Sequence, residues 1–173
     1  MAGRDTTDAC ELDAWIGIGA NLDDPKKTVL AAIRRLDEQD GVTLRRSSSL
    51  YQTKPISNID QPDFINAVVC IRTSLDPLGL LDVLLMVESE FGRTRDDSVN
   101  GPRVLDMDLL IYSDLILDLP ELSVPHPRLT ERLFVLKPLQ EIENSINLPG
   151  LGSIDEYLHA CRNQQVNKLY DDG

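Results

Sequence analysis

Three observations predict an α+β fold for this 173-residue chain. Short apolar runs rich in β-branched residues alternate with two segments of helical periodicity. Their order over residues 14–112 is strand, helix, strand, strand, helix, strand, which is the split βαβ order of ferredoxin-like folds. No repeat, linker or low-complexity segment divides the sequence. We therefore expect a single domain over 1–173, with a mainly antiparallel sheet and both helices on one of its faces.

The expected core begins with a strand and a helix. Residues 14–20 are small and apolar, as in a buried strand, and we expect the polar residues 1–13 before them to be flexible. Asp24 and Pro25 then signal the start of a helix, as its N-cap and its first residue. Gly41 supplies the signal for its C-terminal end.

Two strands and a second helix follow. Residues 42–51 predict a strand, whereas 53–63 predict a loop, because Pro, Asn and Asp recur within it. Residues 64–73 are apolar and β-branched, as in a strand. An Asp-Pro pair at 76–77 repeats the helix-start signal. The leucines that follow at helical spacing predict a strongly amphipathic helix that ends at Gly92.

The last strand of the core precedes a C-terminal extension. Residues 93–103 predict a second polar loop, and 104–112 predict the fourth core strand. In the extension, 113–173, we expect a short hairpin partner at 115–117 and a final helix from about Ser153. The second face of the sheet must be covered by this extension and the long loops, or it must hold a ligand.

The charge balance limits the function of the chain. It has 17 basic and 29 acidic residues, a formal net charge of −12, which argues against binding to nucleic acids or anionic membranes. No apolar run approaches the roughly 18 residues of a membrane span, and the first residues lack the apolar centre of a signal peptide. Cys10, Cys70 and Cys161 are too widely spaced for a disulfide framework or a zinc site. We expect a cytoplasmic protein in which any anionic ligand needs a local cluster of positive charge.

Two carboxylates lie two residues apart in the fourth expected strand. Because strand side chains alternate, Asp106 and Asp108 share one face, while Leu105, Met107 and Leu109 point into the core. Like charges this close repel each other and resist desolvation, so arginine or a metal ion must neutralise them. Mg²⁺ suits two carboxylates, because waters and phosphate oxygens complete its shell. The alternative is an edge strand whose polar face simply meets water.

Arginines flank this strand. Arg93, Arg95 and Arg103 lie in the preceding loop, and Arg128 and Arg132 follow the strand. Guanidinium groups in such loops are suited to binding phosphate oxygens. The alternative for each arginine is that it only pairs with the aspartates. As a set, the arginines supply the positive charge that an anionic ligand needs.

Other chemical motifs are absent or incomplete. The sequence has no P-loop, and Gly17-Ile-Gly19 lacks the third glycine of a dinucleotide-binding fingerprint, so we expect these glycines to allow close packing. His126 is held rigidly between two prolines. Phe64 and Asn66 share one face of the third strand. Phe64 fits ordinary core packing, whereas a buried Asn66 needs partners, which a planar heterocycle with donors and acceptors would supply.

The segment Gly101-Pro-Arg-x-Leu-Asp106-x-Asp108 is the most specific of several ordered motifs. The others are Gly17-Ile-Gly19-Ala-Asn21-Leu, Asp60-Gln-Pro-Asp-Phe-Ile-Asn66, Glu88 with Gly92-Arg93-x-Arg95, and Val124-Pro-His126. Over about residues 15–151 they resemble the 6-hydroxymethyl-7,8-dihydropterin pyrophosphokinase family. The resemblance implies a ferredoxin-like fold and the transfer of diphosphate from ATP to the pterin alcohol in folate biosynthesis, giving AMP and the pterin diphosphate.

The resemblance also implies roles for individual residues. The ligands of two Mg²⁺ ions would be Asp106 and Asp108, which are catalytic together with Arg93 and Arg103. The ATP-binding residues would be Glu88, Arg95, His126 and Arg132. The pterin ring would stack between Phe64 and Phe134, and its edge would bond to Thr53 and Asn66. The loops 53–63 and 93–103 would close over the substrates. The expected partners are therefore these small molecules, with neither nucleic acid nor membrane, and we expect a monomer.

Two other functions stay open at this point. A non-catalytic ferredoxin-like binding module would expose the carboxylates as a solvated face. A different two-metal phosphoryl-transfer enzyme, such as a nuclease, is disfavoured by the acidic charge and by the lack of basic and aromatic strand faces for nucleic acid.

Overall fold

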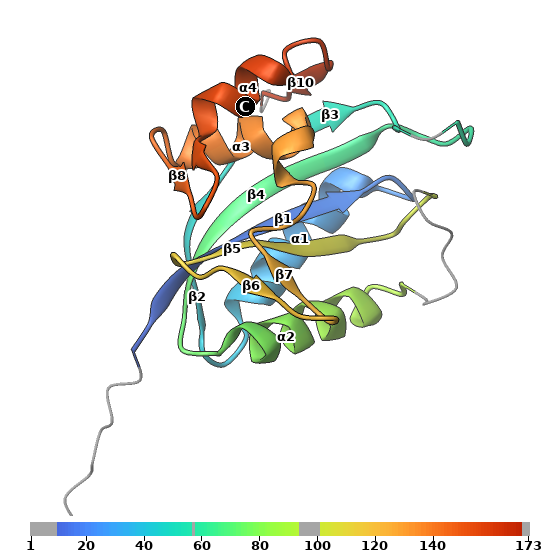
Figure 1. Ribbon diagram of the computed structural model, residues 1–173. Coiled ribbons are helices and arrows are strands. Elements are labelled where there is room, and N and C mark those ends of the chain that lie inside the picture. Colours follow the sequence, from blue (N-terminus) through green and yellow to red (C-terminus); the bar gives the residue numbers. More distant parts are fainter. Residues whose placement is uncertain (1–9, 57, 94–100, 171–173) are drawn as a thin grey trace, which may run out of the picture.

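A computed structural model describes residues 10–56, 58–93 and 101–170 (Figure 1). The strands of its main sheet are β1 (Leu12–Ala20), β2 (Val42–Ser47), β3 (Tyr51–Thr53), β4 (Phe64–Thr73), β5 (Asp106–Tyr112) and β10 (Val166–Lys168). Their order is β10-β3-β4-β1-β5, and β2 also pairs with β4. The pairings between them are antiparallel. The predicted α+β, ferredoxin-like fold is confirmed.

The helices lie on both faces of this sheet. Helices α1 (Pro25–Asp37) and α2 (Pro77–Glu90) cover one face, as predicted, and α3 (Leu133–Ile142) and α4 (Ile154–Ala160) lie on the other (Figure 1). The two predicted N-caps are present. The side chain of Asp24 accepts a hydrogen bond from Lys27 N, and that of Asp76 accepts one from Gly79 N. None of the helices in the described ranges is long and apolar enough to cross a membrane.

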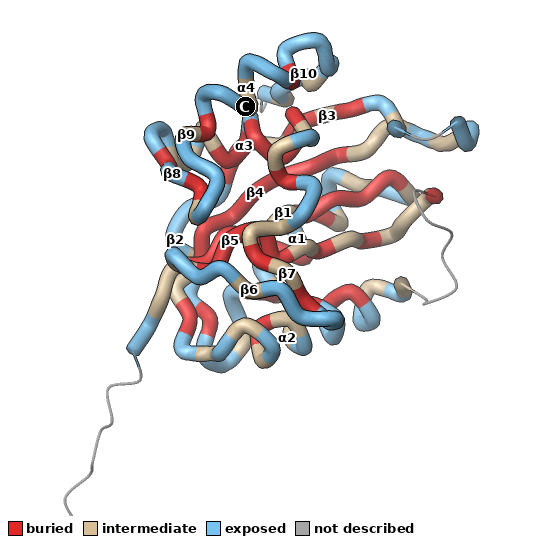
Figure 2. Tube along the Cα trace, viewed as in Figure 1, coloured by how far each residue is buried: buried red, intermediate tan, exposed pale blue. Residues whose placement is uncertain are grey.

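The larger core lies between the sheet and the first two helices. Alternate residues of β1 point into it, and the tube in Figure 2 shows the central strands as mostly buried. β1 begins at Leu12, two residues earlier than expected. Leu12 and Asp13 pair with Thr73 and Arg72, so they belong to the sheet and not to the terminal segment expected to be flexible. Residues 1–9 lie outside the described residues.

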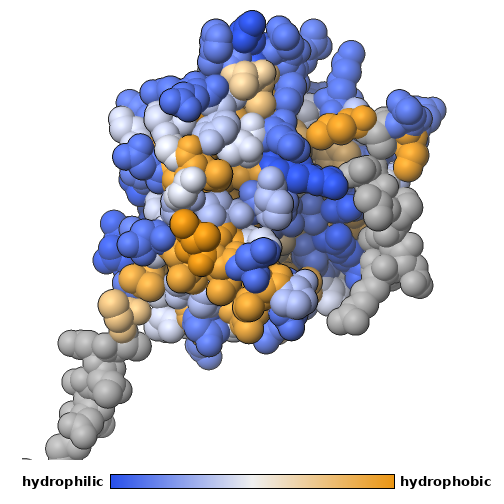
Figure 3. Space-filling view, viewed as in Figure 1, coloured by the Kyte–Doolittle hydropathy of each residue, from blue (hydrophilic) through white to orange (hydrophobic). Residues whose placement is uncertain are grey.

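Helix α2 is less amphipathic than expected. Leu80 and Leu84 are fully buried in the core, but Leu78, Leu85 and Met86 are exposed on the other side of the helix. Figure 3 shows apolar side chains gathered over α2 and the neighbouring hairpin of β6 (Leu117–Asp118) and β7 (Ser123–Val124). The leucines at helical spacing therefore predicted the helix correctly, but the polar outer face of a strongly amphipathic helix is wrong, because exposed apolar side chains lie there.

The predicted strand 42–51 is divided into β2 and β3. Ser47 pairs with Val69 of β4, and Tyr51 pairs with Asn66. The chain therefore advances by four residues on this side but by only three on β4. The one extra residue is typical of a β-bulge. At this point Ser48 N donates a hydrogen bond to Val68 O, and the Ser48 hydroxyl oxygen accepts one from Val68 N in place of a backbone carbonyl.

The C-terminal extension differs most from expectation. The segment 115–117 was expected to pair with the fourth strand, and this is wrong: Leu117 pairs with Val124 in the β6–β7 hairpin. Helix α3 was not predicted, because Pro138 lies inside it and proline normally signals a break. Strand β10 was also missed. The final helix begins as predicted, with Ser153 accepting a hydrogen bond from Asp155 N.

A second apolar core lies under α3 and α4. It contains Trp15, Val68 and Cys70 from the sheet, together with Leu136 and Leu139 from α3. The short elements around it are β8 (Asn147–Leu148), β9 (Gly152–Ser153) and the 3-10 helix η1 (Leu129–Glu131). This core fills one end of the second sheet face and leaves the other end for polar side chains.

We predict that the extension is an essential part of the folded unit. Leu136 is fully buried in the second core, so Leu136→Ala should lower the free energy of unfolding by about 2 to 5 kcal/mol. The control Leu30→Ala, at an exposed site on α1, should cost less than about 1 kcal/mol. Urea denaturation of both variants measures this. An equal, small loss for the two would show that the extension contributes little to stability.

Candidate functional site

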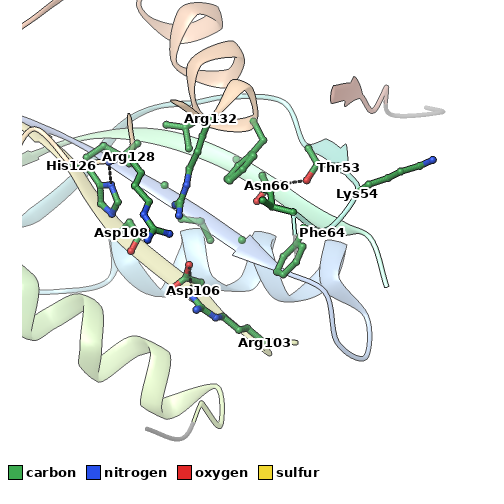
Figure 4. Close-up of a pocket in the computed structure, with 18 of the residues that line it drawn as sticks. Thr53, Lys54, Phe64, Asn66, Arg103, Asp106, Asp108, His126, Arg128 and Arg132 are labelled. Carbon is green, nitrogen blue, oxygen red and sulfur yellow. Dashed lines mark hydrogen bonds and ion pairs between the residues drawn. The ribbon is translucent and has the colours of Figure 1, made fainter. Parts of the chain in front are cut away.

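A cavity of about 310 Å³ opens at the polar end of the second sheet face (Figure 4). It lies between the ends of β1, β4 and β5 on one side and residues 126–135 on the other. Nine of the twelve residues singled out from the sequence line it: Thr53, Phe64, Asn66, Arg103, Asp106, Asp108, His126, Arg132 and Phe134. The fold therefore brings together residues from four separate segments of the chain.

The two aspartates face this cavity as the strand alternation predicts. Asp106 and Asp108 are half-buried at the cavity wall, while Met107 and Leu109 between and after them are buried in the main core. In the pairing of β5 with β1, Asp106 lies opposite Gly19 and Asp108 lies opposite Gly17. The carboxylates thus flank a stretch of strand without side chains.

Gly19 makes room for the amide of Asn66. A Cβ atom at position 19 would lie 2.8 Å from Asn66 Oδ1, closer than non-bonded atoms approach. Asn66 is buried, and its Nδ2 donates a hydrogen bond of 3.0 Å to Thr53 Oγ1. Gly17 and Gly19 both line the cavity. The close packing expected of these glycines therefore serves the shape of the site.

Arginines neutralise Asp106 on both of its oxygens. Arg93 Nη1 lies 2.6 Å from Asp106 Oδ1 and 2.7 Å from Glu88 Oε1. Arg103 Nη1 lies 3.0 Å from Asp106 Oδ2. Glu88 also accepts a hydrogen bond of 2.6 Å from Met107 N, which fixes the end of α2 against β5. Glu88 and Arg93 therefore contact residues of the cavity wall without lining the cavity themselves. Arg95 lies outside the described residues.

Two acidic groups of this network are hard to ionise. Withdrawal from water and the neighbouring Asp106 raise the pKa of Asp108 to about 7, although the nearby arginines oppose the shift. Burial likewise raises the pKa of Glu88 to about 7, against the hydrogen bond from Met107 N and the charge of Arg93. Because burial is the main cause of both shifts, a bound cation would favour the ionised form of each group.

A single 3-10 turn presents two further arginines. Arg128 precedes η1 and Arg132 follows it, and both line the cavity (Figure 4). Leu129, fully buried, anchors the turn in the second core. The guanidinium carbon of Arg132 lies 5.6 Å from the centre of the Phe134 ring. Arg128 was noted in the sequence as part of the arginine cluster but was given no role there.

His126 is fixed by two backbone hydrogen bonds. Its N donates to Leu110 O at 2.8 Å, and its Nδ1 accepts a hydrogen bond of 3.1 Å from Arg128 N. Burial and the charge of Arg132 lower the pKa of His126, which favours the neutral ring. Because Nδ1 accepts, the proton of that neutral ring is on Nε2. His126 is thereby prepared to donate one hydrogen bond.

Asn21 joins the two loops that border the cavity. Its Nδ2 donates to Gln61 Oε1 at 2.9 Å and to Pro62 O at 3.0 Å, and its Oδ1 accepts from Arg103 N at 2.8 Å. The sequence placed Asn21 in a motif without a role, because these partners are distant along the chain. Lys54 at the cavity rim was missed for a different reason: a lone lysine carries no signal.

Comparisons with known proteins match this chain to one family. The family model described as 7,8-dihydro-6-hydroxymethylpterin-pyrophosphokinase (HPPK) matches residues 15–144. A 2-amino-4-hydroxy-6-hydroxymethyldihydropteridine pyrophosphokinase from Pseudomonas aeruginosa is 38% identical over 155 residues, which cover 90% of this chain and 95% of that protein. The corresponding protein from Bacillus subtilis is 42% identical over 129 residues, covering 75% of this chain and 77% of its own length.

Longer proteins contain a similar region. The folic acid synthesis protein fol1 of Pneumocystis carinii is 40% identical over 156 residues, which cover 90% of this chain but only 21% of that protein. The crystal structure of Plasmodium falciparum HPPK-DHPS with pteroate shares the fold, with a TM-score of 0.71 at 15% identity, over 87% of this chain and 42% of that chain. Because the family model and the bacterial relatives match most of the sequence, the chain belongs to the HPPK family.

Proposed function

We propose that this protein transfers diphosphate from ATP to 6-hydroxymethyl-7,8-dihydropterin, producing AMP and the pterin diphosphate in folate biosynthesis. Membership of the HPPK family supports this reaction. The observation in the structure that carries it is one cavity with two chemically different ends. One end holds the carboxylate pair among arginines, and the other holds a buried amide and hydroxyl between aromatic residues. The first suits a triphosphate and the second a planar heterocycle.

Asp106 and Asp108 are the proposed ligands of two Mg²⁺ ions. Both are oxygen donors on one strand face at the cavity wall. Burial raises the pKa of Asp108, and a bound cation would favour its ionised form. Mg²⁺ needs few protein carboxylates, because waters and phosphate oxygens complete its octahedral shell. When bound, such ions neutralise the triphosphate and polarise the phosphorus that is attacked.

Arg93 and Arg103 would bind the transferred phosphates. Both pair with Asp106, a proposed metal ligand, but only Arg103 lines the cavity, so Arg93 would have to turn toward the phosphates. The planar guanidinium group matches phosphate geometry and remains charged throughout the reaction. Diphosphoryl transfer asks the protein mainly for in-line positioning and charge neutralisation, which these residues would supply.

The nucleotide would be held by the segment around η1. His126 would donate a hydrogen bond from its Nε2–H to a phosphate oxygen, and Arg132 would add a positive charge beside it. We add Arg128 to this group, because it lines the same wall. Glu88 acts through Arg93 in this scheme, and the proposed role of Arg95 stays a prediction.

The pterin would occupy the opposite end of the cavity. Thr53 and Asn66 would bond the polar edge of the ring, and Phe64 and Phe134 would stack on its two faces. The hydrogen bond between Asn66 and Thr53 fixes the orientation of the amide before the substrate binds. Closure of the two loops over the substrates, the monomeric state and the cytoplasmic location also stay predictions.

The reaction and its carboxylates are tested together. The protein should form AMP from ATP only when both the pterin alcohol and Mg²⁺ are present. Asp106→Ala and Asp108→Ala should each reduce this rate about a hundredfold or more. Asp114→Ala, an exposed carboxylate just beyond the same strand, should leave it unchanged. Chromatography of the nucleotides measures the rate. Formation of ADP, or of AMP at an equal rate without pterin, would contradict the reaction.

A second prediction concerns the missing side chain at position 19. Gly19→Ala should push the Asn66 amide away from Thr53 and weaken pterin binding about ten- to a hundredfold. The affinity for a non-hydrolysable ATP analogue should change by less than about twofold, because the displaced amide is at the other end of the cavity. Calorimetry with each ligand gives both affinities. Unchanged pterin affinity would remove Asn66 from the pterin site.

A further inference from the structure

The carboxylate of Glu141 joins the C-terminal half of α3 to the sheet. Its Oε1 accepts hydrogen bonds from Ser49 N at 2.9 Å and Ser49 Oγ at 2.7 Å, and its Oε2 accepts one from Tyr51 Oη. Lys168 Nζ on β10 lies 3.8 Å from Oε1. None of these four residues lines the cavity. One side chain therefore links a helix, the β2–β3 connection and an edge strand without touching the site.

This contact is charged and largely shielded. Burial alone would raise the pKa of Glu141, but the hydrogen bonds from Tyr51 and Ser49 outweigh it, so the pKa is lowered and the side chain is ionised. Only 25% of the Glu141 side chain is exposed. Hydrogen bonds to an ionised acceptor are stronger than bonds between neutral groups. Charge-assisted hydrogen bonds therefore attach the C-terminal half of α3 to Ser49 and Tyr51.

On the sheet, the contact acts next to the proposed pterin edge. Tyr51 lies directly opposite Asn66 in the pairing of β3 with β4. Thr53, two residues after Tyr51, is on the same face of β3 and accepts the hydrogen bond of Asn66. Glu141 is thus hydrogen-bonded to β3, the strand that carries Thr53 and pairs with Asn66.

On the helix, the contact is on the face that carries Phe134. Phe134 and Glu141 are seven residues apart, which is about two turns, so both point to the same side of α3. At the opposite end of the helix, Leu133 N donates to Gln164 Oε1, in the segment after α4 and not in the sheet. Buried Leu136 and Leu139 pack α3 on the sheet, and Glu141 adds the polar attachment of the same helix to β3 itself.

We propose that Glu141 is a positioning residue that sets the spacing between the Phe134 ring and the Thr53–Asn66 edge. It thereby determines pterin affinity without contacting the substrate. This inference rests on the proposed placement of the pterin. It assigns to Glu141, Ser49 and Tyr51 a role in pterin affinity that is separate from their contribution to stability.

Neighbouring Glu143 provides a matched control. It follows α3 directly and pairs with Arg46 of β2, so it also attaches the end of the helix to the sheet. However, Arg46 pairs with Cys70 of β4, whereas Tyr51 pairs with Asn66 itself. The attachment at Glu143 is therefore farther from Asn66 along β4. A variant at Glu143 disturbs the same helix end without acting on β3.

The test is calorimetric titration of the pterin alcohol into the full-length protein saturated with Mg²⁺ and a non-hydrolysable ATP analogue. Glu141→Ala should raise the dissociation constant for pterin about tenfold, and Glu141→Gln, which keeps one acceptor, should restore part of the affinity. In both variants the affinity for the ATP analogue should stay within about twofold of the unmodified protein. Glu143→Gln should leave both affinities unchanged.

The outcomes separate the inference from the function on which it rests. If the unmodified protein binds no pterin, the proposed function fails and the inference fails with it. If it binds pterin and Glu141→Ala binds it equally well, or if Glu143→Gln weakens pterin binding as much, only the inference is overturned. Should Glu141→Ala not fold, Tyr51→Phe and Ser49→Ala decide, since each removes a donor to Glu141. Each should then weaken pterin binding selectively, and unchanged affinity in both would overturn the inference.

Discussion

The mutual repulsion of Asp106 and Asp108 is the constraint around which this end of the molecule is arranged. Two carboxylates on one strand face, at the wall of a cavity, cannot both be ionised without positive charge nearby. The fold supplies that charge from two segments, since Arg93 after α2 and Arg103 before β5 both pair with Asp106. Burial, together with the charge of Asp106, nevertheless keeps the pKa of Asp108 raised. An acidic chain with a net charge of −12 thereby gains the local cluster of positive charge that the proposed triphosphate would need.

The sheet topology explains why this charge lies beside a site for a neutral ring. β1 pairs with both β4 and β5, so Gly19 has Asn66 on one side and Asp106 on the other. The missing side chain at that position makes room for the amide of Asn66 in the cavity that Asp106 also lines. Helix α3 then closes the cavity from above with Phe134, and Glu141 on the same helix attaches it to β3. Neighbouring strands thus place the carboxylate pair next to the buried amide, as the proposed transfer from a nucleotide to a pterin requires.

The sequence predicted the parts of this structure whose signals are local. The caps at Asp24 and Asp76, the limits of β4 and the alternation around Asp106 all depend on neighbours within a few residues. Helix α3 was missed because Pro138 contradicts it locally while burial in the second core stabilises it. The motifs and the family resemblance together named nine residues that line the cavity. The roles of Asn21, Gly19 and Glu141, in contrast, depend on partners far along the chain, which no local pattern encodes.

Binding of a non-hydrolysable ATP analogue at controlled Mg²⁺ concentration measures most directly whether the carboxylate pair gathers metal ions for the nucleotide. The charge arrangement predicts tight binding with Mg²⁺ and a loss of roughly a hundredfold in affinity when the metal is removed with a chelator. Two Mn²⁺ ions per chain, counted by electron paramagnetic resonance in the presence of the analogue, should replace Mg²⁺. Equal affinity with and without the metal, or no metal bound beside the nucleotide, would contradict the account.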